Sequence, residues 1–381
     1  MHTHSDRLER WLGAEKVAGI SAAMRGFPHP IGVHGVPGAV YAMPGGDFRG
    51  EIRAGQEVSA VERAVERLAR YNRERRAAVA MHRAFHGPQR RALDRRQHAF
   101  ASLSALIAAA TGGKAQYPQF SKAGVASNAI GNSNELWTRA GVPVAGAAGA
   151  AAPGGTATTS ATAGALAWAN PANANTGHFV TGNPVASAQN TLLLIDQLLR
   201  VAKTMNSTAT EAVTGTFSRY QSATTTAEDY VGGNFCFPAV PTTVLPATAH
   251  NWTVCQYTDQ GGTTAQAFAS TAGVSACVVG GVDLAVGSWY LPLASGDTGV
   301  KALTQMQCSA LVATGTIDFV VAHPIAFMPC PIANLICVAD GVNTAFNLTR
   351  IYDNACLTFL EIMKPATTAA NYAGGLVLVA E

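Results

Sequence analysis

The sequence predicts a mainly β protein: an antiparallel β-sandwich or jelly-roll-like body preceded by an N-terminal extended arm and a helical hairpin. From about residue 112 onward, short apolar runs rich in Thr and Val alternate with Gly, Pro, Asn and Asp, which is typical of strands and turns. Charge divides at the same place: residues 1–111 hold 17 of the 26 Lys and Arg residues and 10 of the 23 Asp and Glu residues. We therefore predict two domains, a basic N-terminal segment (1–111, net charge +7) and a low-charge β-rich body (112–381, net charge −4).

The basic segment is predicted to contain an extended arm and three helices. Residues 5–19 place Leu and Trp at helical spacing, whereas residues 26–50 are too rich in Gly and Pro for a helix and too apolar to float freely in water. Ser59 and Glu62 form a capping box that begins a second helix. A third helix is expected over residues 89–110, and it would form a hairpin with the second.

Eight segments of the body are predicted strands: residues 192–201, 252–258, 276–280, 289–292, 303–309, 317–322, 356–363 and 376–380. The run at residues 188–205 also scans as an amphipathic helix, but its position among strands favours a strand. Many short strands separated by turn residues favour an antiparallel sandwich or jelly roll.

Composition indicates a subunit of an assembly. Charged residues make up 13% of the chain, against about 25% in ordinary soluble domains, while 48% is hydrophobic. A monomer with so few charges has difficulty staying soluble, so we expect much of the surface to contact other subunits. The 7 Cys residues all lie in the body with no Cys-x-x-Cys pair, which favours buried thiols in a reduced compartment. We expect no signal peptide and no membrane segment.

The stretch at residues 141–159, GVPVAGAAGAAAPGGTATT, contains no charge. A free linker is usually Gly/Ser-rich or charged, because polar side chains keep an unpacked chain in water. Small uncharged residues instead allow close backbone approach. We therefore predict that this stretch is ordered against a sheet or a neighbouring subunit.

The basic segment offers two weak candidate sites. His82 and His86 have the spacing of a metal-binding pair, but Arg83 stands where the Glu of a zinc motif would be, so exposed helix histidines are favoured. Acidic residues interrupt the basic run at residues 63–96, and aromatic residues are sparse there. Docking on an acidic protein surface is favoured over direct DNA contact. We expect no metal and no cofactor.

The body shows no motif for nucleotide binding or for a nucleophilic Ser. His323 and Cys330 can be imagined as a catalytic pair, but they lie in an apolar stretch where a buried structural thiol is commoner. Glu228 and Asp229 are the best carboxylate pair for glycoside hydrolysis, yet adjacent residues of an extended chain point to opposite faces. We predict that the protein is not an enzyme and has no catalytic residues.

Five motifs stand out as a set: Leu136-Trp137, the Pro/Gly/Ala stretch at 141–155, TAGALAWANP at 162–171, LLLIDQLL at 192–199 and TATEAV at 208–213. Together they resemble virion structural proteins encoded by many tailed bacteriophages, over about residues 112–325. The resemblance implies a head-associated structural role. The basic segment lies outside it.

Composition and resemblance together lead us to expect a capsid cement (decoration) protein, made in the bacterial host cytoplasm and located in the virion. Its expected partners are the major capsid protein of the same virion and further copies of itself, as a trimer or other homo-oligomer, because linked weak contacts multiply in effect. The predicted capsid anchors are Trp11, Phe27, Tyr41 and Phe48, apolar residues with little other reason to occur there. Packing on the segment's own helices is the alternative for each.

Other functions stay open. The chain could be the major capsid protein itself, although that fold should show a long spine helix and a charged hairpin. A tail or fibre component would show repeats. The alternative of another class is a virion-borne glycan depolymerase, which needs a carboxylate pair inside a groove.

Overall fold

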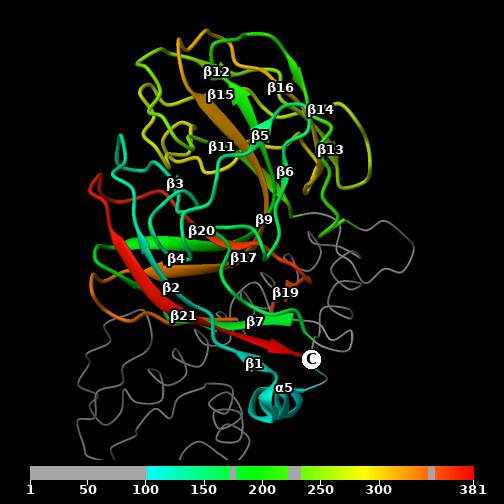
Figure 1. Cartoon of the computed structure of the whole chain (residues 1–381), viewed down its shortest axis with the longest axis vertical. Helices are drawn as coiled ribbons and strands as arrows, with labels where there is room; N and C mark the ends of the chain where they lie inside the picture. The colour runs from blue at the N-terminus through cyan, green and yellow to red at the C-terminus, as the bar shows by residue number, and fades with distance from the viewer. Residues whose placement is uncertain (1–99, 101, 172–176, 222–232, 342–347) are drawn as a thin grey trace, which may run out of the picture. The chain divides into compact units, whose positions relative to one another are not determined.

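The computed structural model describes residues 100, 102–171, 177–221, 233–341 and 348–381 (Figure 1). The chain divides after Arg90, and every described residue belongs to the second unit, Arg91–Glu381. This unit is mainly β with antiparallel sheets, and its described part contains one short α-helix, which confirms the predicted class. The predicted arm, the two earlier helices and the four anchors, Trp11, Phe27, Tyr41 and Phe48, lie outside the described residues.

Two long antiparallel strands form the centre of the body. β9 (Asn190–Thr204) and β17 (Thr316–Cys330) pair along their whole lengths, and register shifts after Val321 and Pro324 mark irregularities where such a ribbon bends. They lie within a seven-stranded sheet of order β11 (Phe235–Ala239), β17, β9, β20 (Leu357–Glu361) and β3 (Asn134–Glu135). Because β9 is buried on both faces, its apolar residues do not alternate with polar ones along the strand, and this explains why it also scanned as a helix.

A second sheet packs on the first (Figure 1). Its strands are, in order, β18 (Ala339–Asp340), β7 (Gly177–Gly182), β21 (Asn371–Ala380), β2 (Gln119–Ala123) and β4 (Gly141–Val142), with β1 (Ala115–Gln116), β8 (Val185–Ala186) and β19 (Arg350–Ile351) paired beside them. The ring of Phe120 on β2 lies 4.4 Å from that of Phe359 on β20, centroid to centroid, so the two sheets share one core.

Two smaller sheets lie at the other end of the β9–β17 ribbon (Figure 1). One contains β10 (Glu211–Ala212), β16 (Val300–Met306), β13 (Gln256–Asp259) and β14 (Gln266–Ala267), and the other contains β12 (Asn251–Trp252) and β15 (Thr271–Ala272). The indole of Trp252 meets the ring of Phe319 on β17 edge to face, at a centroid distance of 4.9 Å, which joins this end to the ribbon.

Five predicted strands correspond to observed ones, with shifted ends: β9, β16, β17, β20 and β21. The segment at 252–258 splits into β12 and β13. The strands predicted at 276–280 and 289–292 are wrong. The first is a turn, because Ala276 and Gly280 both have positive φ. The second makes only isolated backbone hydrogen bonds, from Leu291 to Cys236 of β11 and from Ala269 to Pro292.

The helix predicted over residues 89–110 is shorter in its described part. α5 (Leu103–Ala109) begins after Ser102, whose extended backbone and side-chain bond to the Ala105 amide form an N-cap. Leu106 packs against Val379 of β21, so the helix belongs to the same unit as the sheets. Among the described helices, none is long and apolar enough to cross a membrane.

The uncharged stretch lies along β9, as predicted. It contributes β5 (Ala150–Ala151) and β6 (Thr156–Ala157), which pair with β9 at residues 199–202, just beyond the part of β9 that pairs with β20. Before these strands, the Trp137 indole NH donates to the Ala147 carbonyl at 2.7 Å, and a Cβ added at Gly146 would lie 2.0 Å from the indole. Only a glycine allows this approach.

We expect Gly146→Ala to lower the free energy of unfolding by about 1–3 kcal/mol, because the added methyl group would displace the buried Trp137 ring. Urea unfolding of the full-length protein measures this. Gly154→Ala, in the same stretch, is the matched control: a Cβ there meets nothing within 4 Å, so the change should stay below about 0.5 kcal/mol. Equal effects of the two substitutions would contradict the packing described.

Candidate functional site

Half of the charged residues in the described part of the chain are buried, although charged side chains almost never are unless paired. They are Lys122, Glu135, Asp196, Arg200, Lys203, Asp259, Asp283, Asp318, Glu361 and Lys364. The hydrogen-bond and ion-pair partners of these side chains show whether they bind a ligand or hold the protein together.

Arg200, on β9, lies at the centre of the largest buried ion cluster, which we call the arginine centre. Its guanidinium donates to both oxygens of Glu135, at 2.7 and 2.9 Å, and to Asp318 at 2.9 Å from Nε. Nη1 also donates to Gln197 at 2.9 Å, and the Trp137 ring lies 5.5 Å from the guanidinium carbon. Burial alone would lower the pKa of Arg200, but the charges of Glu135 and Asp318 raise it. The guanidinium therefore stays charged and paired.

The arginine centre is built to hold segments together. All three guanidinium nitrogens already donate to protein oxygens, and the Arg200 side chain is only 1% exposed. Asp318 also accepts the Gly149 amide at 2.8 Å, so the uncharged stretch is tied directly to the ion cluster. Such a saturated arginine is a structural junction rather than an anion-binding site.

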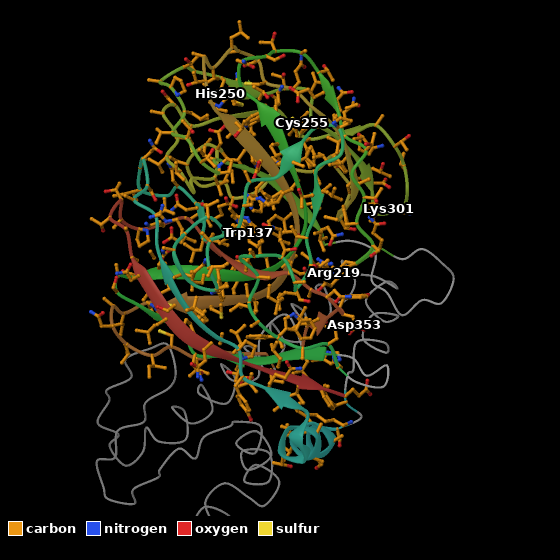
Figure 2. All side chains as sticks on the ribbon, viewed as in Figure 1. Trp137, Arg219, His250, Cys255, Lys301 and Asp353 are labelled. Atoms are coloured by element: carbon orange, nitrogen blue, oxygen red, sulfur yellow. The ribbon has the colours of Figure 1, made fainter. Side chains whose placement is uncertain are left out.

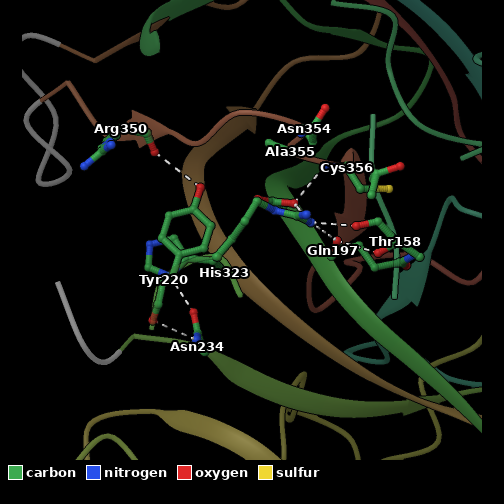
Figure 3. A network of polar contacts seen from close by, with 12 residues as sticks. Thr158, Gln197, Tyr220, Asn234, His323, Arg350, Asn354, Ala355 and Cys356 are labelled. Carbon is green, nitrogen blue, oxygen red and sulfur yellow. Dashed lines mark hydrogen bonds and ion pairs between the residues drawn. The ribbon is translucent and has the colours of Figure 1, made fainter. Parts of the chain in front are cut away.

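A second arginine–carboxylate pair joins Arg219 to Asp196 of β9, near Thr158 and Gln197, which Figure 3 labels. Arg219 donates to both oxygens of Asp196, at 2.8 and 2.9 Å, and to the carbonyls of Thr158 and Gln197. The Thr158 hydroxyl donates to the same Gln197 carbonyl. The end of the uncharged stretch is therefore held to β9 by a charge-assisted network.

His323 and Tyr220 form a stacked pair beside this network (Figure 3). Their rings are 3.8 Å apart and 5° from parallel. The Asn234 amide nitrogen faces two carbonyls, so its oxygen accepts from Nδ1 of His323 at 2.8 Å. Burial lowers the pKa of His323 to about 3, so the imidazole is neutral at pH 7.

Three buried lysines join loops through backbone carbonyls. Lys122 donates to the carbonyls of Arg139 and Pro143 at 2.8 and 2.9 Å. Lys203 donates to the Glu211 carboxylate and to the carbonyls of residues 207 and 209. Lys364 donates to the carbonyls of residues 125 and 368. Each ammonium replaces water around loop backbone that would otherwise have unpaired acceptors.

His250 and Asp283 look like half of a catalytic triad, with Nε2 of the histidine 2.8 Å from the carboxylate. The other ring nitrogen lies 2.9 Å from the Thr248 carbonyl, which can only accept. Burial alone would lower the pKa of His250, but the hydrogen bond to Asp283 raises it. Both ring nitrogens are occupied, so the pair connects loops in the upper part of the view in Figure 2 instead of activating a nucleophile.

Of the candidate pairs considered in the sequence analysis, one lies within the described residues, and its two members are not brought together. His323 and Cys330 lie on the same strand, seven residues and therefore about 20 Å apart. Glu228, Asp229, His82 and His86 lie outside the described residues. Within the described ranges, no group of three or more His, Cys, Asp or Glu side chains could hold a metal ion. The thiols agree better with prediction, because six of the 7 cysteines are buried and free, whereas Cys337 is half-buried.

Among the exposed large apolar side chains of the described residues, two groups lie on neighbouring positions. The first, which we call the apolar loop, is residues 331–338 between β17 and β18, where Ile332, Leu335, Ile336 and Val338 are between 51% and 68% exposed. In the second group, Ile130, Val286 and Met363 come from three loops that backbone hydrogen bonds hold together at Gly131. Exposed apolar groups of this kind mark surfaces that contact other molecules.

The sequence analysis did not find the arginine centre. Its members were visible as isolated charges inside apolar runs, such as Arg200 after LLLIDQLL, and a charge in a buried strand requires a partner.

Figure 2 shows Trp137 near the middle of the described region and Lys301 toward its rim. Trp137 is accordingly buried, and Lys301 is partly exposed.

Comparisons with protein-family models, with curated proteins and with solved structures found no match to this chain.

Breaking the arginine centre should destabilise the body strongly. We expect Arg200→Met and Glu135→Gln each to lower the free energy of unfolding by about 3–5 kcal/mol, because each leaves a buried group without its partner. Urea unfolding followed by Trp fluorescence measures the change. Lys114→Met, at an exposed lysine, is the control and should stay within about 0.5 kcal/mol. A loss as small as that of the control would contradict a paired and buried charge cluster.

Acid should destabilise the body through His323. The unfolded chain takes up a proton near pH 6.5, whereas the folded histidine stays neutral down to about pH 3. The contribution of the neutral His323 to the free energy of unfolding is therefore fully present above pH 6.5 and is lost as pH falls. The free energy of unfolding then decreases by up to about 1.4 kcal/mol for each pH unit. We expect His323→Gln to reduce this slope between pH 4 and 6 in urea unfolding. His250→Gln is the control, because a histidine with a raised pKa is protonated between pH 4 and 6 in both the folded and the unfolded chain. An unchanged slope in His323→Gln would contradict a buried, neutral His323.

Proposed function

We propose that this protein is a structural component of a bacteriophage head, a capsid cement protein that binds the major capsid protein and further copies of itself. The observation that carries the proposal is the distribution of side chains in the body. Half of the charged side chains in the described part of the chain are buried, while large apolar side chains stand exposed on surface loops. This arrangement suits a subunit whose surface is covered by neighbours in a shell.

The location of the phage-like motifs supports this proposal. Trp137 and Leu166 are fully buried, residues 192–199 lie in β9, and the stretch at 141–155 pairs with that strand. These motifs therefore build one packed region around the arginine centre. A resemblance that includes core residues supports a shared body, whereas one confined to surface loops would not.

We further propose that the body is a jelly-roll-like sandwich and that residues 1–111 form a basic domain with an extended arm. Two packed antiparallel sheets support the sandwich. In this proposal the body contacts neighbouring subunits through its apolar loops, and the arm adds a second attachment through Trp11, Phe27, Tyr41 and Phe48. Two weak attachments on one chain bind far more tightly than either alone.

Capsid binding by the full-length protein tests the proposal. We expect size-exclusion chromatography with light scattering to give a small defined homo-oligomer that binds bare capsids. Replacing the four anchors, Trp11, Phe27, Tyr41 and Phe48, by Ala should weaken binding by a factor of ten or more, since buried aromatic anchors each contribute more than about 1 kcal/mol. Tyr117→Ala, at an aromatic residue that is 66% exposed on the body, is the control and should bind normally.

Two results would count against this function. Unchanged capsid binding by the four-residue variant would show that the arm is not an anchor. Assembly of the purified protein into closed shells would identify it as the major capsid protein instead.

A further inference from the structure

We propose that Cys330 and Cys337 form an intramolecular disulfide under oxidising conditions, which fixes the apolar loop against the second sheet. The two thiols lie at the ends of this loop: Cys330 is the last residue of β17, and one residue separates Cys337 from β18. All 7 cysteines are free thiols in the structure.

The path of the loop brings the two cysteines together. The Asn334 amide donates to the Ala186 carbonyl at 2.7 Å and the Cys337 amide donates to the Pro184 carbonyl at 3.0 Å, so the loop returns along residues 184–186. The Cys337 side chain packs against the core cluster that contains Cys330, and β18, which follows Cys337, lies in contact with β17. Cys337 is also close enough to Cys330 to help raise the pKa of its thiol. No strand or helix lies between them, so the backbone can adjust to the geometry of a disulfide.

Exposure distinguishes this pair from the other cysteines. Cys337 is half-buried, whereas the other six are buried, so an oxidant reaches Cys337 first. Burial raises the pKa of Cys330 to about 12, which makes it a poor first nucleophile. Cys337 is therefore the attacking thiol and Cys330 the resolving one. Cys255 and Cys308 also lie near each other, but both are buried.

Glutathione disulfide serves as the oxidant in two steps. The Cys337 thiolate, having lost its proton to water, attacks one sulfur of glutathione disulfide, and the S–S bond breaks to release one glutathione, which takes up a proton. The Cys330 thiol then loses its proton to water and attacks the Cys337 sulfur of the mixed disulfide, releasing the second glutathione, which is protonated in turn. Two protein thiols are oxidised to one disulfide, and one glutathione disulfide is reduced to two glutathione molecules.

The consequence for a virion rests on the proposed function, whereas the disulfide itself does not. Thiols stay reduced in a bacterial cytoplasm, so the apolar loop would remain adjustable during assembly. Outside the host, oxidation would hold Ile332, Leu335, Ile336 and Val338 in one arrangement, because the crosslink ties both ends of the loop to the core.

Disulfide mapping on the full-length protein tests this inference. We expect incubation of the reduced protein with glutathione disulfide to remove two hydrogens from its mass, and chymotryptic cleavage at Leu335 to yield Cys330 and Cys337 in linked peptides. The oxidised protein should unfold several degrees higher than the reduced protein. Cys337→Ser should abolish both effects with little loss of stability, and Cys308→Ser, the matched control, should preserve both.

Four outcomes would overturn the inference: no change in mass, a glutathione adduct that persists on Cys337, a disulfide between Cys255 and Cys308, or a link between two chains. All these readouts come from the isolated protein, so they are independent of whether it binds capsids.

Discussion

The fold depends on the pairing of one buried guanidinium with two carboxylates. An unpaired charge in the interior costs several kcal/mol, so the segments carrying Glu135, Arg200 and Asp318 must meet for the chain to fold. Their meeting fixes the position of β3 and β17 relative to β9 and brings Trp137 beside the guanidinium. The same charge cluster orders the uncharged stretch, because Asp318 accepts the Gly149 amide. One ion cluster thus organises segments from four parts of the chain.

A body whose strands are mostly short has many loop carbonyls to satisfy, and buried cations meet part of this need. Lys122, Lys203, Lys364 and Arg219 each donate to the carbonyls of loops or irregular segments. A charge so placed binds several acceptors at once and fixes the loop that carries them. In the described part of the chain, half of the charged side chains are used inside, while large apolar side chains stand exposed on surface loops.

These two features connect the fold to the proposed role in a phage head. A subunit within a shell gains stability from its neighbours and needs rigid, low-charge surfaces for them to cover. Internal ion pairs supply the rigidity, and the exposed apolar groups supply surfaces for contact. The Cys330–Cys337 pair lies at the base of one such surface, so its redox state would act on contact geometry and leave the ion pairs unchanged.

The sequence by itself determined the β class, the course of β9, the burial of most thiols and the ordering of residues 141–159, because these follow from local patterns of apolar, small and uncharged residues. It did not determine the start of α5 after Ser102 or the turn at 276–280, where capping and positive φ overrode local preference. Only the tertiary structure decided the ion pairs. Arg200 lies 65 residues from Glu135 and 118 from Asp318, and no local spacing encodes contacts across such separations.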